Sequence, residues 1–179
     1  MAQKRWRTWE IIGLFVVLAA GNLLHFVYQW TGRQHFTAVF ASVNESTWEH
    51  IKLLVVPWVI WSFVEWWAMH DRNHPTLVAR AAGLLAGVVT IPLLFYTYQG
   101  IVGRNVDLVN IIIFQVAVLM AFWISWIMQD HRKLTGTLWQ IIGGVILLGV
   151  WAILVWWTYA PPDLPIFVDP QTKMRGIPQ

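Results

Sequence analysis

The sequence predicts an all-α integral membrane protein, in which a bundle of five transmembrane helices is followed by an extended, proline-rich carboxyl-terminal tail. Composition is the first observation that predicts this class. Apolar residues make up 58% of the 179 residues and charged residues 12%, against about 45–50% and about 25% in soluble domains. The second observation is that the apolar residues fall in five runs, each close to the roughly 20 helical residues that cross a bilayer core.

The five expected spans belong to one membrane domain over residues 1–160. They are residues 10–30, 46–69, 79–99, 106–128 and 138–159. Pro57 and Pro92 lie inside the second and third spans, where each is expected to kink the helix. Gly83 and Gly87 are one turn apart in the third span, a spacing that favours close packing of helices.

The tail, residues 161–179, holds five of the eight prolines and is therefore expected to be extended. It also carries apolar side chains between Leu164 and Val168, which favour packing on the outer face of the bundle. We expect Phe167 to be buried there.

Charge distribution predicts the orientation. Seven lysines and arginines lie at the end of the bundle with the amino terminus, and five lie at the other end. The positive-inside rule therefore places the amino terminus in the cytoplasm and the carboxyl terminus outside. The formal net charge of +3 is small and gives no indication of a nucleic-acid partner. Cysteine is absent, which excludes disulfides, thiolate metal sites and cysteine nucleophiles.

The densest polar segment, residues 42–52, directly precedes the apolar part of the second span. If the helix begins near Ser46, then Glu45, Glu49 and Lys52 share one face, with His50 on its flank. Capping is the alternative interpretation, because a serine followed three residues later by a glutamate forms a capping box. The segment holds two such boxes, Ser42 with Glu45 and Ser46 with Glu49. Capping requires neither His50 nor Lys52, and ionisable groups at membrane depth are functional by default.

A polar stripe of Asn22, His25 and Gln29 runs along the second half of the first span. In the predicted topology it shares the outer layer with the polar ends of three other spans, whereas the inner half of the bundle is expected to be glycine, alanine and leucine. The layer is also expected to include Tyr98 and Gln99. The candidate ligand-binding residues are His25, Gln29, Glu45, Glu49, His50, Lys52, Tyr96, Asp107 and Asn110.

Within this layer we expect His25 and Glu49 to lie within direct or one-water reach of each other. The candidate metal ligands are His25, Glu45, Glu49 and His50, and a divalent metal is the candidate cofactor. Glu49 and His50 are the candidate general base and acid. Glu49→Gln is expected to leave the protein folded and abolish its function.

Two further groups of polar residues are expected to have structural roles only. Glu65 is too far along the second span to join the outer layer and is expected to pair locally, for example with Arg72 or Arg80, or to face the lipid headgroups. His70 and His74 could bind a metal only if the helix continued through them, and Pro75 disfavours that.

The pattern Asn44-Glu45-Ser46-x-Trp48-Glu49-His50-x-Lys52, with Pro162-x-Leu164-Pro165-x-Phe167-x-Asp169-Pro170 in the tail, resembles a bacterial family of small multi-span membrane proteins of unknown function. The resemblance implies a multi-span protein, expected in the bacterial cytoplasmic (inner) membrane, and assigns no activity. The family's tail reaches a Tyr-Gly pair where this chain has Arg175-Gly176.

Three functions compete. The first is binding or transport of a small cationic or amphipathic ligand in an outward-facing acidic and histidine-rich pocket. Five spans without an internal repeat fit inverted-repeat transporters poorly, so a homodimer is then a candidate assembly. The second is a membrane-embedded enzyme that acts on a lipid-like substrate by metal-assisted or Glu/His acid–base chemistry. The third is an accessory subunit whose polar cluster is structural. The lipid bilayer is the expected partner in all three.

Overall fold

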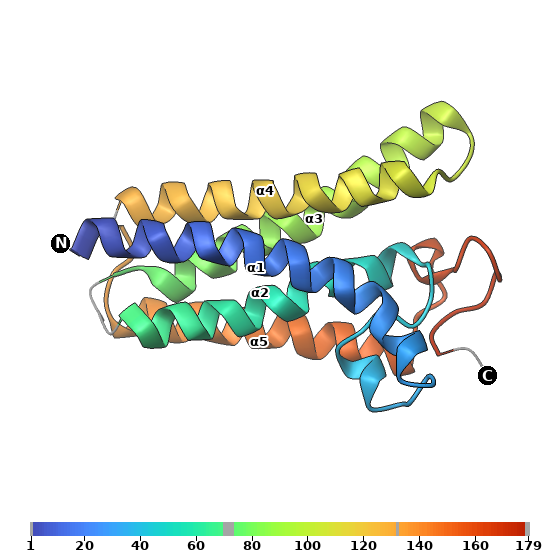
Figure 1. Cartoon of the computed structure of the whole chain (residues 1–179), viewed down its shortest axis with the longest axis horizontal. Helices are drawn as coiled ribbons and strands as arrows, with labels where there is room; N and C mark the ends of the chain where they lie inside the picture. Colours follow the sequence, from blue (N-terminus) through green and yellow to red (C-terminus); the bar gives the residue numbers. More distant parts are fainter. Residues whose placement is uncertain (1, 70–73, 132, 178–179) are drawn as a thin grey trace.

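A computed structural model, which describes residues 2–69, 74–131 and 133–177, shows an elongated helical bundle with the chain ends at opposite ends (Figure 1). The helices are α1 (Ala2–Trp30), α2 (Thr47–Met69), α3 (Thr76–Val102), α4 (Asp107–His131) and α5 (Thr137–Tyr159), with short 3-10 turns η1 (Thr37–Val39) and η2 (Pro165–Phe167). Within the described ranges there is no β-sheet, and the β pairing is one isolated bridge between Val168 and Arg175. All five long helices are apolar and long enough to cross a membrane.

The prediction of an all-helical protein with five helices of membrane-spanning length is therefore confirmed, and such helices indicate a multi-pass membrane protein. The helix bounds differ from the expected spans at several ends. In particular, α3 runs from Thr76 to Val102, beyond residues 79–99 at both ends. The added residues are Thr76, Leu77 and Val78 at the start and Gly100, Ile101 and Val102 at the end, and the helix stops at Gly103, which has a left-handed backbone.

Helix α2 is the central element of the bundle. It packs against α1, α3 and α5, and 61% of its apolar window is buried inside the protein, against 22% for α1 and for α5. A helix that is apolar all round is expected at such a position. Side chains that α2 carries near its start therefore point into protein in most directions.

Small residues allow the helices around α2 to approach closely. A Cβ added to Gly83 of α3 would clash with the carbonyl oxygen of Ala121 in α4 and lie 2.9 Å from the ring of Trp58. Gly143 of α5 lies in the same way against the backbone of Leu77 and Val78. Glycine at these crossings is required by space, which is how small residues serve membrane helices.

The two ends of the bundle differ in shape. At the end away from the amino terminus, the last turns of α3 and the first turns of α4 diverge from α1, α2 and α5 (Figure 1). The tail folds over this end, and Phe167 is 2% exposed, as expected. Its ring lies 4.7 Å from the ring of Trp48 and 5.8 Å from that of Trp157.

The half of the bundle near the amino terminus corrects one expectation, because it is not made of glycine, alanine and leucine alone. Glu10, Glu65 and Arg80 are each at most 1% exposed in that half. Arg80 Nε lies 3.6 Å from Glu65 Oε2, so this pairing agrees with the expected local partner. Arg72, the other candidate, lies outside the described residues.

His70 also lies outside the described residues, so the paired histidine site has only one described member. His74 is buried, and its Nδ1 lies 3.1 Å from Thr76 Oγ1.

Candidate functional site

The start of α2 determines which side chains can meet at the divergent end of the bundle. The helix begins at Thr47, and the hydroxyl of Ser46 accepts a hydrogen bond from the backbone N–H of Glu49 at 3.3 Å. The N–H of Ser46 donates to Asn44 Oδ1 at 2.9 Å. Ser46 is thus the N-cap of α2, and Glu45 precedes the helix.

This start corrects the expected arrangement of the polar segment. Because Glu45 lies before the helix, it does not share a helical face with Glu49 and Lys52. The first expected capping box is also absent, since the hydroxyl of Ser42 donates to the carbonyl of Asn44 at 2.8 Å. The second is half formed, because Ser46 caps Glu49 but the Glu49 carboxylate accepts from the N–H of Val43 at 3.1 Å.

Glu49 and Lys52 form a buried ion pair, and the carboxylate and the ammonium each make further hydrogen bonds to the protein. Lys52 Nζ donates to Glu49 Oε2 at 2.7 Å and to the carbonyls of Ala38 and Ala41 at 2.9 and 3.3 Å. The hydroxyl of Thr158 in α5 donates to Glu49 Oε1 at 2.8 Å. Both charged side chains are at most 1% exposed. The pair therefore joins the 31–46 connection, α2 and α5, and the structure does not bring Glu49 to His25.

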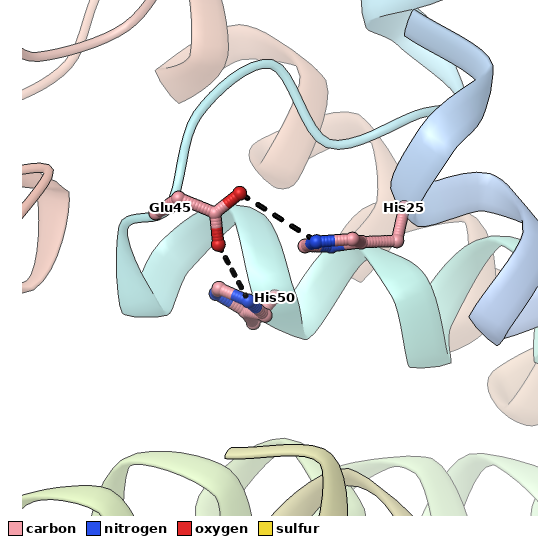
Figure 2. Close-up of side chains that lie close together, drawn as sticks. All are labelled: His25, Glu45 and His50. Atoms are coloured by element: carbon pink, nitrogen blue, oxygen red, sulfur yellow. Dashed lines mark ion pairs between the residues drawn. The ribbon is translucent and has the colours of Figure 1, made fainter. Parts of the chain in front are cut away.

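Three other side chains point toward one another in the divergent region (Figure 2). His25 comes from α1, Glu45 from the connection before α2, and His50 from the first turn of α2. Glu45 Oε1 lies 3.5 Å from His25 Nε2, and Glu45 Oε2 lies 3.5 Å from His50 Nε2. The centroids of the two imidazole rings are 5.5 Å apart. All three side chains are half-buried.

The orientation of the His50 ring is fixed by the backbone of the preceding helical turn. Its Nδ1 lies 2.9 Å from the carbonyl oxygen of Ser46, and a carbonyl can only accept a hydrogen bond. Neutral His50 therefore carries its proton on Nδ1, and the lone pair on Nε2 faces Glu45. Histidines that bind metal ions are oriented in this way, by a carbonyl or carboxylate on the second ring nitrogen.

The spacing of the three groups is close to that of a metal ligand set. One ligand atom from each of His25, Glu45 and His50 lies within 4.8 Å of the other two. Ligand atoms about 2.1 Å from a tetrahedral Zn²⁺ are about 3.4 Å apart, which is near the two 3.5 Å separations. Two imidazoles and one carboxylate suit a transition metal better than Mg²⁺ or Ca²⁺.

A cavity of about 250 Å³ opens beside this group. Asp107 and Asn110 of α4 line it together with the two histidines, and the amide of Asn110 is fixed by Tyr98 and Asn105. The complete lining is Gly21, Asn22, His25, Phe26, Glu45, His50, Leu53, Asp107, Asn110, Ile111, Phe114 and Gln171. This lining carries two carboxylates and, among the described residues, no lysine or arginine, so its charge favours a cation.

The structure thus brings together five of the predicted site residues, namely His25, Glu45, His50, Asp107 and Asn110. It places Gln29 on the surface and Glu49 and Lys52 in the buried pair. Tyr96 and Gln99 line a separate cavity of about 350 Å³ between α3 and the tail.

Sequence reasoning missed two contributions to the cavity. Gln171 reaches it from the tail, which was expected to lie over this end but not to supply a lining side chain. Phe26, Ile111 and Phe114 give it an apolar wall. Nothing in the sequence distinguished those three from lipid-facing residues of the same spans.

Fold and site together describe a bundle of five helices long and apolar enough to cross a membrane, with a cavity lined by histidines and carboxylates of α1, α2, α4 and the connection before α2. No curated protein and no solved structure matches the chain. The sequence profile of DUF6512, described as a family of unknown function, matches residues 1–177. The chain therefore belongs to DUF6512.

Proposed function

We propose that this protein binds a divalent transition-metal ion through His25, Glu45 and His50, with Zn²⁺ as the best-fitting ion. The observation that carries the proposal is the convergence of the three side chains with separations of 3.5 Å between Glu45 and each histidine. Unlike an acidic surface cluster, the set is drawn from α1, the 31–46 connection and α2, and the His50 ring is oriented by Ser46.

The pocket beside the metal position takes an amphipathic ligand. Phe26, Ile111 and Phe114 provide apolar contacts, whereas Asp107 and Asn110 provide hydrogen-bonding groups. Three protein ligands leave a coordination position open, as in metal sites that bind a water or substrate molecule. The distribution of lysines and arginines supports a pocket on the outer side of a bacterial cytoplasmic membrane.

Metal analysis of the purified protein tests the proposal. The wild type, incubated with Zn²⁺ and freed of excess ion, is expected to retain one ion per chain. His25→Ala and His50→Ala each remove one of three ligands and are expected to weaken binding at least tenfold. His35→Ala is the matched control, because His35 is an exposed loop histidine outside the pocket. Wild type without bound metal, or equal retention in all four proteins, would contradict the proposal.

A second candidate function is hydrolysis of a lipid-like substrate. It is favoured by Asp107, a second carboxylate that lines the same pocket as His25 and His50. A metal at this site would activate a water molecule, and Asp107 is the carboxylate placed to accept its proton. Release of fatty acid or headgroup from phospholipid vesicles, measured by mass spectrometry, tests this function. Asp107→Asn is expected to abolish release while metal stoichiometry is unchanged; release that persists in this variant would contradict the assignment.

A further inference from the structure

A second group of charged side chains lies in the other half of the bundle, near the amino terminus. Glu10 comes from α1, Glu65 from α2 and Arg80 from α3, and each is at most 1% exposed. Arg80 Nη1 lies 3.0 Å from Glu10 Oε2, and Arg80 Nε lies 3.6 Å from Glu65 Oε2. We call these three residues the inner cluster. With both carboxyl groups ionised, the inner cluster would hold two negative charges and one positive charge.

The cation of this cluster is fixed in place. Arg80 Nε donates to the hydroxyl of Ser62 at 3.1 Å. Its guanidinium carbon lies 3.8 Å from the ring centroid of Trp58 and 4.6 Å from that of Phe122. Cation–π contacts of this kind stabilise a desolvated guanidinium, and arginine stays protonated in proteins. Arg80 therefore balances one carboxylate and leaves the other unbalanced.

The two carboxyl groups have unequal partners. Glu10 accepts from Arg80, from the hydroxyl of Ser125 at 2.6 Å and from the side-chain amide of Gln129. Among the described residues Glu65 accepts one hydrogen bond, from Gln129 at 3.4 Å. Hydrogen bonds to a carboxylate favour its charged form, so Glu10 is the ionised member and Glu65 is the group that carries the excess charge or a proton.

Three buried polar atoms of the same cluster lack a hydrogen-bond partner in the described ranges, which indicates that the cluster binds something further. Glu65 Oε2, Arg80 Nη2 and Gln129 Oε1 are buried and have no hydrogen-bond partner within the described part of the chain. Such atoms are rare in native structures because each costs free energy. A proton on Glu65 would remove the unbalanced charge and turn an unpaired acceptor into a donor.

We propose that the inner cluster is a proton-binding site in which Glu65 holds a proton at neutral pH while Glu10 pairs with Arg80. Among the described arginines at this end, Arg5 and Arg7 have other partners. Arg7 is paired with Asp130 at 2.8 Å, and Arg5 donates to the carbonyl of Ala68. His74 packs against Trp6 and Thr76. On α5, the polar group at this end is Gln140, which bonds the backbone of Leu77 and His74.

The sign of the pH dependence follows from this assignment. A glutamate is ionised in the unfolded chain at neutral pH, because its ordinary pKa is about 4.3. The folded protein then binds one proton more than the unfolded chain, so its stability falls as pH rises until the proton leaves the folded state. The thermal unfolding midpoint of the wild type is therefore expected to fall between pH 6 and pH 9.

Infrared spectroscopy and thermal unfolding of the full chain in detergent test the proposal together. The wild type at pH 7 is expected to show the carbonyl stretch of a protonated carboxyl group. Glu65→Gln, a neutral isostere, is expected to remain folded, to lose this band, and to lose the fall of the midpoint from pH 6 to pH 9. Asp163→Asn, an exposed carboxylate of the tail that lies outside both sites, is the control and is expected to keep both.

Two results would overturn the proposal. The first is a wild type without a protonated carboxyl band, or a band that persists in Glu65→Gln. The second is a Glu65→Gln protein that fails to fold, since the site would then require a charged carboxylate. Neither readout depends on metal at His25, Glu45 and His50, so failure of the metal site leaves this test intact.

Discussion

Glu45 and Glu49 are four residues apart, and their carboxylates have different surroundings. Glu45 is half-buried and faces two imidazoles at 3.5 Å. Glu49 is 1% exposed and accepts from Lys52, Thr158 and the backbone of Val43. A carboxylate whose bonds are all made by the protein has no free position for a ligand. Glu45 is therefore the functional candidate of the two, and Glu49 is a structural residue.

Glu49→Gln is expected to destabilise the protein, which reverses the expectation that it would stay folded without function. The change leaves the ammonium of Lys52 buried without a counter-charge, and breaking a buried pair in this way costs roughly 3–5 kcal/mol. The measurement is the free energy of unfolding in detergent. The double variant Glu49→Gln/Lys52→Met removes both charges and is expected to recover part of the loss. A free energy of unfolding equal to that of the wild type in Glu49→Gln would show that the ion pair does not stabilise the protein.

The sequence indicated the residue types of both sites but not their partners. His25 and His50 were placed in one layer correctly, because helix length alone sets depth. Their partner was expected to include Glu49, since the choice between Glu45 and Glu49 depends on the helix starting at Thr47. Arg80 was expected as one possible partner of Glu65, but its full burial and its second partner, Glu10, were not expected. Nothing local to residue 80 reveals that Glu10 of α1 lies beside it.

At the scale of elements, the helices were predictable from apolar length. The tail was expected to be extended, but it forms the η2 turn and a bridge between Val168 and Arg175. The relative placement of elements was not predictable, because it depends on crossings such as Gly83 against Ala121 and on the divergence of α3 and α4 from the other helices. The pocket exists because of that divergence. The sequence therefore predicted the depth of the pocket in the bundle. It did not predict that Asp107 and Phe114 of α4 would form one of its walls.

The tail is held by one aromatic anchor and a few backbone contacts. Phe167 packs between Trp48 and Trp157, and the side chain of Asn44 donates to the carbonyl of Gly176 at 2.7 Å. Truncation of a buried phenylalanine costs roughly 3–5 kcal/mol. Because Gln171 lines the pocket, an undocked tail would also open the cavity on that side.

Phe167→Ala is therefore expected to release the tail without unfolding the helices. Hydrogen–deuterium exchange over residues 163–177 is expected to accelerate in this variant, while exchange in α2 and α3 stays slow. Leu164→Ala, in the same tail but 53% exposed, is the control and is expected to leave exchange unchanged. Equal exchange in both variants would mean that the anchor lies elsewhere in the tail.

At the scale of the whole molecule, polar groups gather at both ends of an otherwise apolar bundle, and their burial changes the evidence for orientation. Arg80 and Lys52 are each 0% exposed and paired inside the protein. Removing them from the comparison leaves six cations at the amino-terminal end and four at the other. The amino-terminal end therefore still carries more cations than the other end, since one residue is removed from each.

The orientation is testable because the chain has no cysteine, so one introduced cysteine can be labelled without background. Lys173 in the tail and Thr135 between α4 and α5 are both exposed and lie at opposite ends of the bundle. The positive-inside rule places the amino-terminal end in the cytoplasm. In intact cells a membrane-impermeant maleimide is therefore expected to label Lys173→Cys, and to label Thr135→Cys only after permeabilisation. The reverse pattern would place the His25, Glu45 and His50 pocket on the cytoplasmic side, and its metal would then come from the cytoplasm.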